Sequence, residues 1–205
     1  MNPNNISEVP PGLLKLGTKK TFPKGSHIYK TTSNIAYCYL IISGMVKIYI
    51  DHENGRRSIL DFIGHNNWLG ELSLFYYETD IKENTVLSEV QCLEYDINEL
   101  RQYCKENANI SYYFASFISG KLLSRSYRMS EYMNYSLEKR LASFIIQYQH
   151  DGIYDLPHTD VSEYMNVSYR HILHVLKHFC ELNILTKSRG YYITDYTKLN
   201  EIATQ

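Results

Sequence analysis

Side chains able to bind an anionic polymer are concentrated in residues 165–180. This stretch contains one arginine, one lysine and three histidines, and it contains no aspartate or glutamate. An arginine guanidinium can donate two hydrogen bonds to guanine O6 and N7, and a lysine ammonium can neutralise a phosphate. The segment is therefore a candidate nucleic-acid interface; the plainer alternative is a solvated polar face of a helix.

Local signals predict two helices joined by a tight turn around this segment. Thr159 is placed to cap a short helix that ends near Met165. Asn166 tolerates the left-handed conformation that a sharp turn between helices requires. Ser168 is placed to cap the second helix. The apolar side of that helix consists of Ile172, Val175, Leu176 and Phe179.

A hairpin is predicted directly after the second helix. Residues 184–186 and 191–194 have strand character, and Ser188-Arg189-Gly190 between them is a turn signal. Helix, tight turn, helix and hairpin is the layout of a winged helix-turn-helix, whose second helix enters the major groove of DNA. The residues expected to contact bases or phosphates are Ser168, Tyr169, Arg170, His171, His174, Lys177, Lys187 and Arg189.

The first half of the chain has the alternation and punctuation of β-structure. Ser43-Gly44 is expected to separate two strands, and Asn54-Gly55 is a strong hairpin signal. Strands are predicted over residues 19–22, 27–29, 37–43, 45–51, 57–63, 83–87 and 89–95. Short strands punctuated this often indicate a barrel or sandwich rather than βαβ units.

A long amphipathic helix is predicted after the strands. Asp96 is placed to cap a short helix over 97–104, and the longer helix follows from about Asn109 to a break at 134–136. Its stripe, spaced by three and four, consists of Ile110, Phe114, Phe117, Ile118, Leu122, Arg125, Met129, Tyr132 and Met133. The stripe alone favours a helix packed on its own β-domain. The alternative is a dimer helix that meets its symmetry mate.

The bulk composition is that of an ordinary globular protein. The 205 residues are 44% hydrophobic and 21% charged, enough for one large domain or two small ones. Because the formal net charge is −1, any electrostatic footprint for DNA must be local. No signal-peptide pattern and no apolar run of ~20 residues are visible, so a cytoplasmic protein without a membrane partner is expected.

Metal, cofactor and catalytic chemistry are not indicated. Four cysteines lie far apart without C-x-x-C spacing, which favours small buried apolar residues and leaves any redox role open: Cys38, Cys92, Cys104 and Cys180. A cupin-like metal enzyme would need a His-x-His pair with a glutamate and a further histidine. His27, His52 and His65 stand singly, so this alternative is weak.

Four segments in order resemble the Crp/Fnr superfamily of bacterial regulators over almost the whole chain. Phe22-Pro23-Lys24-Gly25 with Ile28-Tyr29 resembles the opening signature of that family's β-roll, and residues 39–48 resemble its central hairpin. Residues 70–75, Gly-Glu-Leu-Ser-Leu-Phe, resemble the opening of its phosphate cassette. Residues 167–177 fit the frame of its recognition helix. Each motif is weak alone, and the four together are specific.

The resemblance implies an α+β fold. It consists of an N-terminal β-roll sensor (1–108; a double-stranded β-helix, or jelly-roll-like), a long dimerisation helix (109–134) and a C-terminal winged helix-turn-helix (135–205). It also favours the dimer reading of the long helix. The expected dimer interface consists of Phe114, Phe117, Ile118, Leu122, Arg125 and Met129.

The candidate effector pocket departs from that of cyclic-nucleotide-binding members. Those members hold the phosphate with an Arg-Ser or Arg-Thr pair, and the corresponding positions here are Asp80 and Ile81. A phosphate needs clustered donors without adjacent carboxylates, so control by cyclic AMP is not expected. Glu71 is expected to cap a short helix near Ser73. The residues assigned to an effector pocket are Gly70, Glu71, Leu72 and Lys82.

The sequence therefore predicts a sequence-specific DNA-binding transcription regulator that reads an inverted repeat as a homodimer. Its expected partners are double-stranded DNA, a second copy of itself, RNA polymerase if it activates, and an unidentified small-molecule effector. Tyr169 and Arg170 stand where the best-known members carry Arg-Glu, so the operator should differ from theirs. The competing hypotheses are the cupin-like enzyme and a nucleotide-sensing module that acts only on protein partners.

Overall fold

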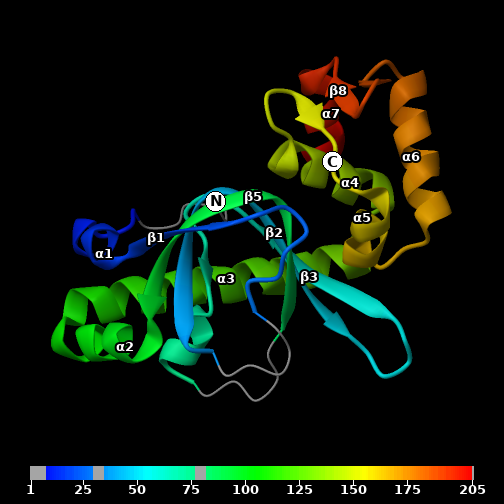
Figure 1. Cartoon of the computed structure of the whole chain (residues 1–205). Helices are drawn as coiled ribbons and strands as arrows, with labels where there is room; N and C mark the ends of the chain where they lie inside the picture. The colour runs from blue at the N-terminus through cyan, green and yellow to red at the C-terminus, as the bar shows by residue number, and fades with distance from the viewer. Residues whose placement is uncertain (1–7, 30–34, 77–81, 205) are drawn as a thin grey trace. The chain divides into compact units, whose positions relative to one another are not determined.

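The computed structural model describes residues 8–29, 35–76 and 82–204. The chain forms two compact units, Met1–Arg125 and Ser126–Gln205 (Figure 1). The division falls inside a long helix, α3 (Ala108–Asn134), rather than at either of its ends. The predicted helix therefore exists, but its residues contribute to both units.

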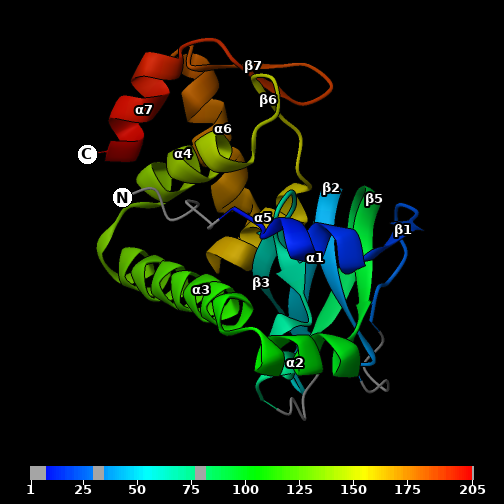
Figure 2. The same cartoon turned by 90° about the vertical axis from the view of Figure 1, so that its left-hand side faces the viewer.

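The N-terminal unit is built on one antiparallel sheet with strand order β1-β5-β2-β3 and with β4 paired to β2. Helix α1 precedes the first strand, the 3₁₀ helix η1 lies between β4 and β5, and α2 follows the last strand. Figure 2 shows α2 at one end of the sheet. The elements are α1 (Pro11–Leu16), β1 (Thr18–Phe22), β2 (Tyr37–Asp51), β3 (Arg57–Ile63), β4 (Trp68–Leu69), η1 (Glu71–Leu74), β5 (Glu83–Asp96) and α2 (Ile97–Glu106).

Two long strands replace four of the predicted short ones. Residues 37–51 form the single strand β2, and residues 83–96 form β5, because the two pair with each other along most of their length. The predicted turn at Ser43-Gly44 is wrong: Gly44 has φ +87° and lies at an irregularity of the β2–β5 register. A Cβ at Gly44 would collide with the Glu89 carbonyl, so this close approach requires glycine.

The β2–β3 hairpin is confirmed, and the strand predicted over 27–29 is wrong. Gly55 has φ +77°, and Asp51 pairs with Arg57 across the turn. Residues 27–29 instead lie against Asn84, a fully buried side chain. The Oδ1 atom of Asn84 accepts from the backbone N–H groups of Ile28 at 2.7 Å and Tyr29 at 3.3 Å. A buried amide therefore satisfies the backbone donors that a strand partner would otherwise satisfy.

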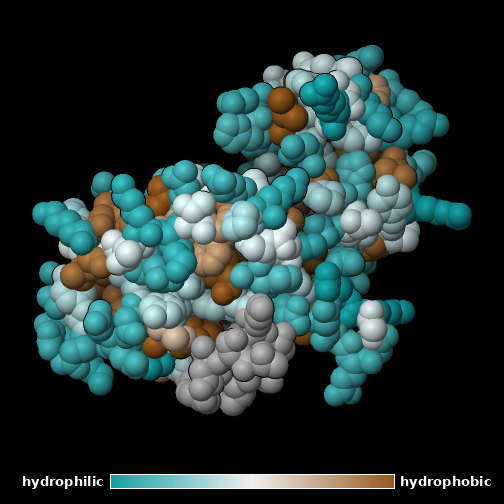
Figure 3. Space-filling model, in the orientation of Figure 1, coloured by the Kyte–Doolittle hydropathy of each residue, from teal (hydrophilic) through white to brown (hydrophobic). Residues whose placement is uncertain are grey.

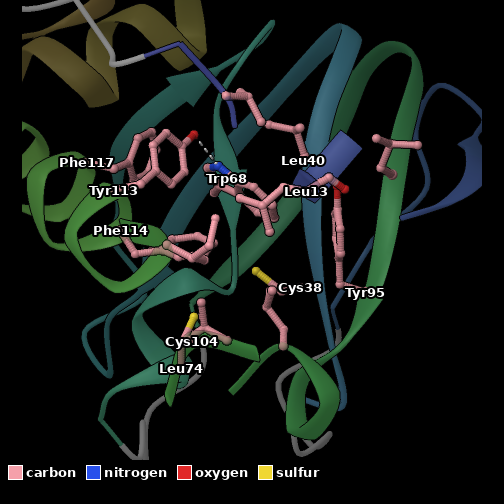
Figure 4. Packing of buried hydrophobic residues seen from close by; sticks show 14 of the residues in the cluster. Leu13, Cys38, Leu40, Trp68, Leu74, Tyr95, Cys104, Tyr113, Phe114 and Phe117 are labelled. Atoms are coloured by element: carbon pink, nitrogen blue, oxygen red, sulfur yellow. Dashed lines mark hydrogen bonds between the residues drawn. The ribbon is translucent and has the colours of Figure 1, made fainter. Parts of the chain in front are cut away.

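The main core of the N-terminal unit joins the sheet to the first half of α3. Trp68 is fully buried, and its Nε1 donates to the Tyr113 hydroxyl at 2.9 Å (Figure 4). The ring of Phe114 lies 4.9 Å from that of Trp68, edge to face. Cys38 and Cys104 lie in the same cluster as small buried residues, as their scatter predicted. This packing sets which side of α3 faces the sheet.

The C-terminal unit combines four helices with a small three-stranded sheet of order β6-β8-β7. Helix α4 contacts both α6 and α7, as Figure 2 shows. The elements are α4 (Leu137–Tyr148), β6 (Ile153–Tyr154), α5 (His158–Met165), α6 (Tyr169–Glu181), β7 (Leu185–Lys187), β8 (Tyr191–Ile193) and α7 (Tyr196–Thr204). The hairpin β7–β8 confirms the predicted wing; β6 and α7 were not predicted.

Helix starts follow the predicted capping chemistry at two of three positions. The Asp96 carboxylate accepts from the N–H groups of Asn98 and Glu99, and Ser168 accepts from that of His171. Thr159 does not cap α5: the helix begins at His158 after Pro157, which has no side-chain acceptor. The fixed φ of proline suits the entry to a helix, so the start lies two residues earlier than a threonine cap implies.

Two further properties bear on function. Within the described parts of the chain, no helix is both long and apolar enough to cross a bilayer. The same residues contain no group of three or more His, Cys, Asp or Glu side chains arranged to hold a metal ion.

We expect Phe114→Ala to lower the free energy of unfolding by about 3–5 kcal/mol, because it leaves a ring-sized cavity beside Trp68. Urea denaturation followed by circular dichroism measures the change. Tyr112→Ala, on the same helix but 76% exposed, is the control and should be nearly neutral. Equal losses for the two variants would contradict the assignment of Phe114 to the core.

Candidate DNA interface and effector pocket

A tight helix-turn-helix positions the candidate DNA-binding side chains. Asn166 ends α5 in the left-handed conformation, with φ 53° and ψ 47°. The Ser168 hydroxyl then accepts from the N–H of His171 at 3.3 Å and starts α6. The predicted apolar face of α6 is buried throughout: Ile172, Val175, Leu176 and Phe179. Burial of that face leaves the opposite face of α6 to solvent.

All eight residues predicted to contact DNA are exposed. Arg170 and His171 lie in the first turn of α6, His174 lies one turn further, and the wing carries Lys187 and Arg189. Six of the eight lie on α6 or cap it, and their side chains include no carboxylate. The face can therefore donate hydrogen bonds to bases and phosphates, and the one carboxylate of α6, Glu181, lies at the far end of the helix.

Lys177 is the one basic residue of this face with an acidic neighbour among the described residues of α6. Its Nζ lies 3.5 Å from Glu181 Oε1, and the two side chains are 77% and 59% exposed. An exposed i,i+4 pair of this kind contributes little, because water screens it. A phosphate could replace Glu181 as the partner of Lys177 at small cost.

His158 lies in the middle of an aromatic cluster in this unit. This residue was not identified from the sequence. Its ring stacks on Tyr154 at 6.1 Å, and it lies 5.5 Å from Tyr191 of the wing and 6.5 Å from Tyr169 of α6. Burial, with a smaller contribution from Lys187, lowers the pKa of His158 below its ordinary value of 6.5. The cluster joins the start of α5, the start of α6 and the wing. No spacing of residues in the sequence signals it, because its members are brought together only by the fold.

The last turns of α3 hold the end of α5. The Tyr132 hydroxyl donates to the Tyr164 carbonyl at 2.6 Å, and the Arg128 guanidinium lies 5.0 Å from the Tyr164 ring centroid. Arg140 of α4 donates to the Met165 carbonyl at 3.2 Å. These bonds satisfy the terminal carbonyls of α5 directly before the turn that aims α6.

The predicted role of Glu71 as a helix cap is wrong. Gly70, with φ +86°, starts η1 without a side-chain cap, and Glu71 Oε1 instead accepts from Lys121 Nζ at 2.8 Å. The two side chains are only 4% and 17% exposed, so the carboxylate needs an opposite charge in place of the water it has lost. Lys121 comes from α3, about 50 residues away, which no local pattern could show.

The predicted effector residues do lie together. Gly70, Glu71, Leu72 and Lys82 line one cavity, to which α3 adds Lys121 and Arg125. The Arg125 Nε atom is buried and has no hydrogen-bond partner among the described residues. The cavity holds only about 40 Å³, which is room for one or a few water molecules. Asp80 and Ile81, the positions aligned with the phosphate-binding pair, lie outside the described residues.

The predicted dimer interface divides into two sets. Phe114 and Phe117 are 0% and 3% exposed because they pack in the core of their own unit, so their assignment to the interface is wrong. Leu122 and Met129 are 65% and 68% exposed. At about 100° per residue, the exposed set lies roughly a third of a turn from the buried set. The single stripe predicted from the sequence therefore combines residues from two adjacent faces of α3.

Comparison with known proteins is consistent with this architecture. Residues 19–107 match the sequence profile of the cyclic nucleotide-binding domain. The chain is 27% identical over 171 residues to the regulatory protein YeiL of Escherichia coli O157:H7, covering 83% of this chain and 78% of YeiL. It is 25% identical over 126 residues to a CRP-like cAMP-activated global transcriptional regulator of Mycobacterium tuberculosis, covering 62% and 56% of the two chains.

The fold recurs along its whole length in a solved structure. A protein from Eubacterium rectale, assigned to the Crp/Fnr family of transcriptional regulators, superposes with a TM-score of 0.76 over 100% of both chains, at 16% identity. At such low sequence identity, the superposition shows that the two proteins share a fold. Together with the matched domain and the sequence relatives, it makes the chain similar to transcription regulators of the Crp/Fnr type.

The similarity in sequence to a known domain covers only part of the chain. The matched domain ends at residue 107, so it includes the Glu71 pocket but neither α3 nor the helix-turn-helix. For those parts, the similarity is one of fold, and the turn at Asn166, the Ser168 cap and the buried face of α6 are all present. The predicted α+β fold class is confirmed.

We expect the stability of the protein to fall as the pH drops below about 6.5, the ordinary pKa of histidine. Since burial lowers the pKa of His158 in the folded state, the unfolded state takes up the proton first. Urea denaturation at pH 7.5 and 5.5 should therefore show a smaller loss for His158→Phe than for the parent. His174→Phe, at an exposed position, is the control. An unchanged loss in His158→Phe would exclude this histidine as the cause.

Proposed function

We propose that this transcription regulator is a non-enzymatic, cytoplasmic protein that binds an inverted-repeat operator as a homodimer through α6. The observation that carries the proposal is the exposed polar face of α6, which carries no carboxylate before Glu181 at the end of the helix, opposite a fully buried apolar face. Double-stranded DNA presents phosphates along its backbone and hydrogen-bonding base edges in its major groove, which match these donors. No observation in the described residues favours the cupin-like enzyme.

The eight DNA-contacting residues divide into two roles. Arg170, in the first turn of α6, is proposed to read guanine through a bidentate contact, with Tyr169, His171 and His174 beside it. Ser168 and the N–H groups at the start of α6 suit a phosphate oxygen. Lys177, Lys187 and Arg189 are proposed to contact phosphates, where they add affinity but little sequence preference.

An exposed side of α3 is proposed as the dimer interface. Leu122 and Met129 lie seven residues apart, so they share one side of the helix. The half-buried Ile118, which also packs on its own core, and Arg125, which also lines the Glu71 cavity, lie beside them. Leu122 and Met129 are large apolar side chains left mostly in water by the single chain. A symmetric partner would bury them in a short coiled coil. RNA polymerase, if the protein activates transcription, and a small-molecule effector are further proposed partners.

We expect Leu122→Asp with Met129→Asp to disrupt the dimer, because each change would bury a carboxylate against the partner's apolar side chains. Sedimentation velocity measures the oligomeric state. Tyr112→Asp, exposed on another side of α3, should leave the dimer intact. A double variant that still sediments as the parent does would exclude this face as the interface.

Cyclic AMP is not expected to bind at physiological concentrations. Glu71 is already paired with Lys121, and the cavity beside it holds about 40 Å³, far below the ~300 Å³ of the smallest common ligand sites. Isothermal titration calorimetry should show no heat beyond that of 5′-AMP, the control for weak nonspecific binding. Micromolar affinity for cyclic AMP would overturn this expectation.

We expect Arg170→Ala to cost about 1–3 kcal/mol on the operator and to flatten the preference at one base position per half-site. The operator should be selected from random DNA, with half-site centres about 10–11 bp apart. Fluorescence anisotropy on operator and scrambled DNA, over a range of salt concentrations, gives both affinity and specificity.

The matched controls are Lys177→Ala and Arg189→Ala. Because they remove proposed phosphate contacts, they should weaken binding to all sequences and reduce its dependence on salt. If Arg170→Ala weakens binding to operator and scrambled DNA equally, then Arg170 contacts the backbone and another residue of α6 reads the bases.

A further inference from the structure

A cavity of about 660 Å³ opens between α1, α2 and the adjoining ends of β1, β2 and β5. It lies in the N-terminal unit and shares no lining residue with the Glu71 pocket. Its volume lies within the range of small-molecule sites in proteins, about 300–1,000 Å³. In Figure 3, hydrophobic and hydrophilic residues are interspersed over the part of this unit where α1 and α2 lie. The proposed DNA and effector functions leave this cavity unused.

The walls of the cavity are held in place by the core of the unit. The Tyr95 hydroxyl donates to the Leu13 carbonyl at 2.9 Å, which ties the sheet to α1. Gly17 lets the connection from α1 to β1 lie directly on Tyr95, because a Cβ there would come within 2.6 Å of the Leu93 Cβ and 2.7 Å of the Tyr95 ring. The cavity is therefore bounded by well-packed elements.

Apolar side chains supply much of the cavity surface. Leu16 is 55% exposed and Tyr37 is 42% exposed, although both are large. Leu100 and Tyr103 of α2 line the cavity with them. Exposed aromatic and aliphatic side chains around a concave surface can bind the flat or apolar part of a small molecule.

The charged side chains of the lining are all acidic. Glu94, Asp96, Glu99 and Glu106 contribute to it, and no lysine, arginine or histidine does. Glu94 already has a cation, since Lys20 Nζ lies 3.5 Å from its Oε2. Asp96 is engaged as the cap of α2. The two remaining carboxylates are those of α2 itself.

Glu99 and Glu106 have no ion pair with another described residue. They are seven residues apart, so they lie on one side of α2 about 10 Å apart along its axis. Glu106 is the last residue of the helix, where the terminal carbonyls add partial negative charge. It accepts one hydrogen bond, from the Gln102 amide at 2.5 Å. A ligand cation would therefore meet carboxylates that form no ion pair within the described parts of the chain.

We propose that this cavity is a second ligand site, for a small organic amine with an aromatic or apolar body. The ammonium group would pair with Glu99 or Glu106, and the body would lie against Tyr37, Tyr103 and the leucines. Anionic ligands, nucleotides included, are disfavoured because four carboxylates line the site. The proposal goes beyond DNA binding and does not depend on it.

The test uses tyramine as the probe, with two analogues of the same size that differ in charge. Tyrosol replaces the ammonium with a neutral hydroxyl, and 4-hydroxyphenylacetate replaces it with a carboxylate. Titration of the full chain, followed by ligand-observed NMR, should rank affinity as tyramine first, tyrosol weaker and 4-hydroxyphenylacetate absent. Equal affinities for tyramine and tyrosol, or binding by none of the three, would overturn the proposal.

The double variant Glu99→Gln with Glu106→Gln tests whether the carboxylates of α2 bind the probe. It keeps the size of both side chains and should weaken tyramine roughly tenfold, as expected for the loss of two partly exposed ion pairs. Glu53→Gln, exposed in the turn between β2 and β3, is the matched control. Circular dichroism and operator binding should be unchanged in both variants. Unchanged tyramine affinity in the double variant would exclude this cavity, whereas failure of the parent to bind DNA would count only against the proposed function.

Discussion

The packing of the first half of α3 against the sheet is the constraint on which the rest of the structure depends. The fully buried Trp68 contacts Phe114 edge to face and donates to the Tyr113 hydroxyl. Because Tyr113 and Phe114 are adjacent in α3, their two contacts with Trp68 fix the rotation of this helix about its own axis. All positions further along α3 then have a determined direction, because a helix advances by about 100° per residue.

Two functional consequences follow from that rotation. Lys121 is directed to the β-domain, where it neutralises the buried carboxylate of Glu71. Leu122 is directed away from it and stays exposed. The same helix thus closes the small cavity beside Glu71 and leaves exposed the apolar side chains proposed as the dimer interface.

In the C-terminal unit, α6 depends on supports at its start and along its length. Its polar face is open because Ile172, Val175, Leu176 and Phe179 bury the other side. Its start is held by Ser168 and by the aromatic cluster around His158. The end of α5 is held by Tyr132, donating to the Tyr164 carbonyl. These contacts hold α5 and α6 on either side of the tight turn, so they limit how far the face of α6 proposed to bind DNA can tilt.

The sequence by itself determined the features that depend on neighbours along the chain. The Asn166 turn, the Ser168 and Asp96 caps, the Asn54-Gly55 hairpin and the buried face of α6 all follow from local conformational preference and helical period. Their order, with the family resemblance, was enough to predict the α+β fold and the DNA-binding helix. The tertiary structure decided the features that depend on contacts between distant segments. Gly44 lies in a continuous strand because β5 pairs on both sides of it. Glu71 is an ion-pair partner rather than a cap because Lys121 reaches it from α3. Phe114 and Phe117 belong to the core because the sheet covers one side of a helix whose apolar stripe is wider than a single interface. A periodic pattern states which residues share a side of a helix, but only the fold states what each side meets.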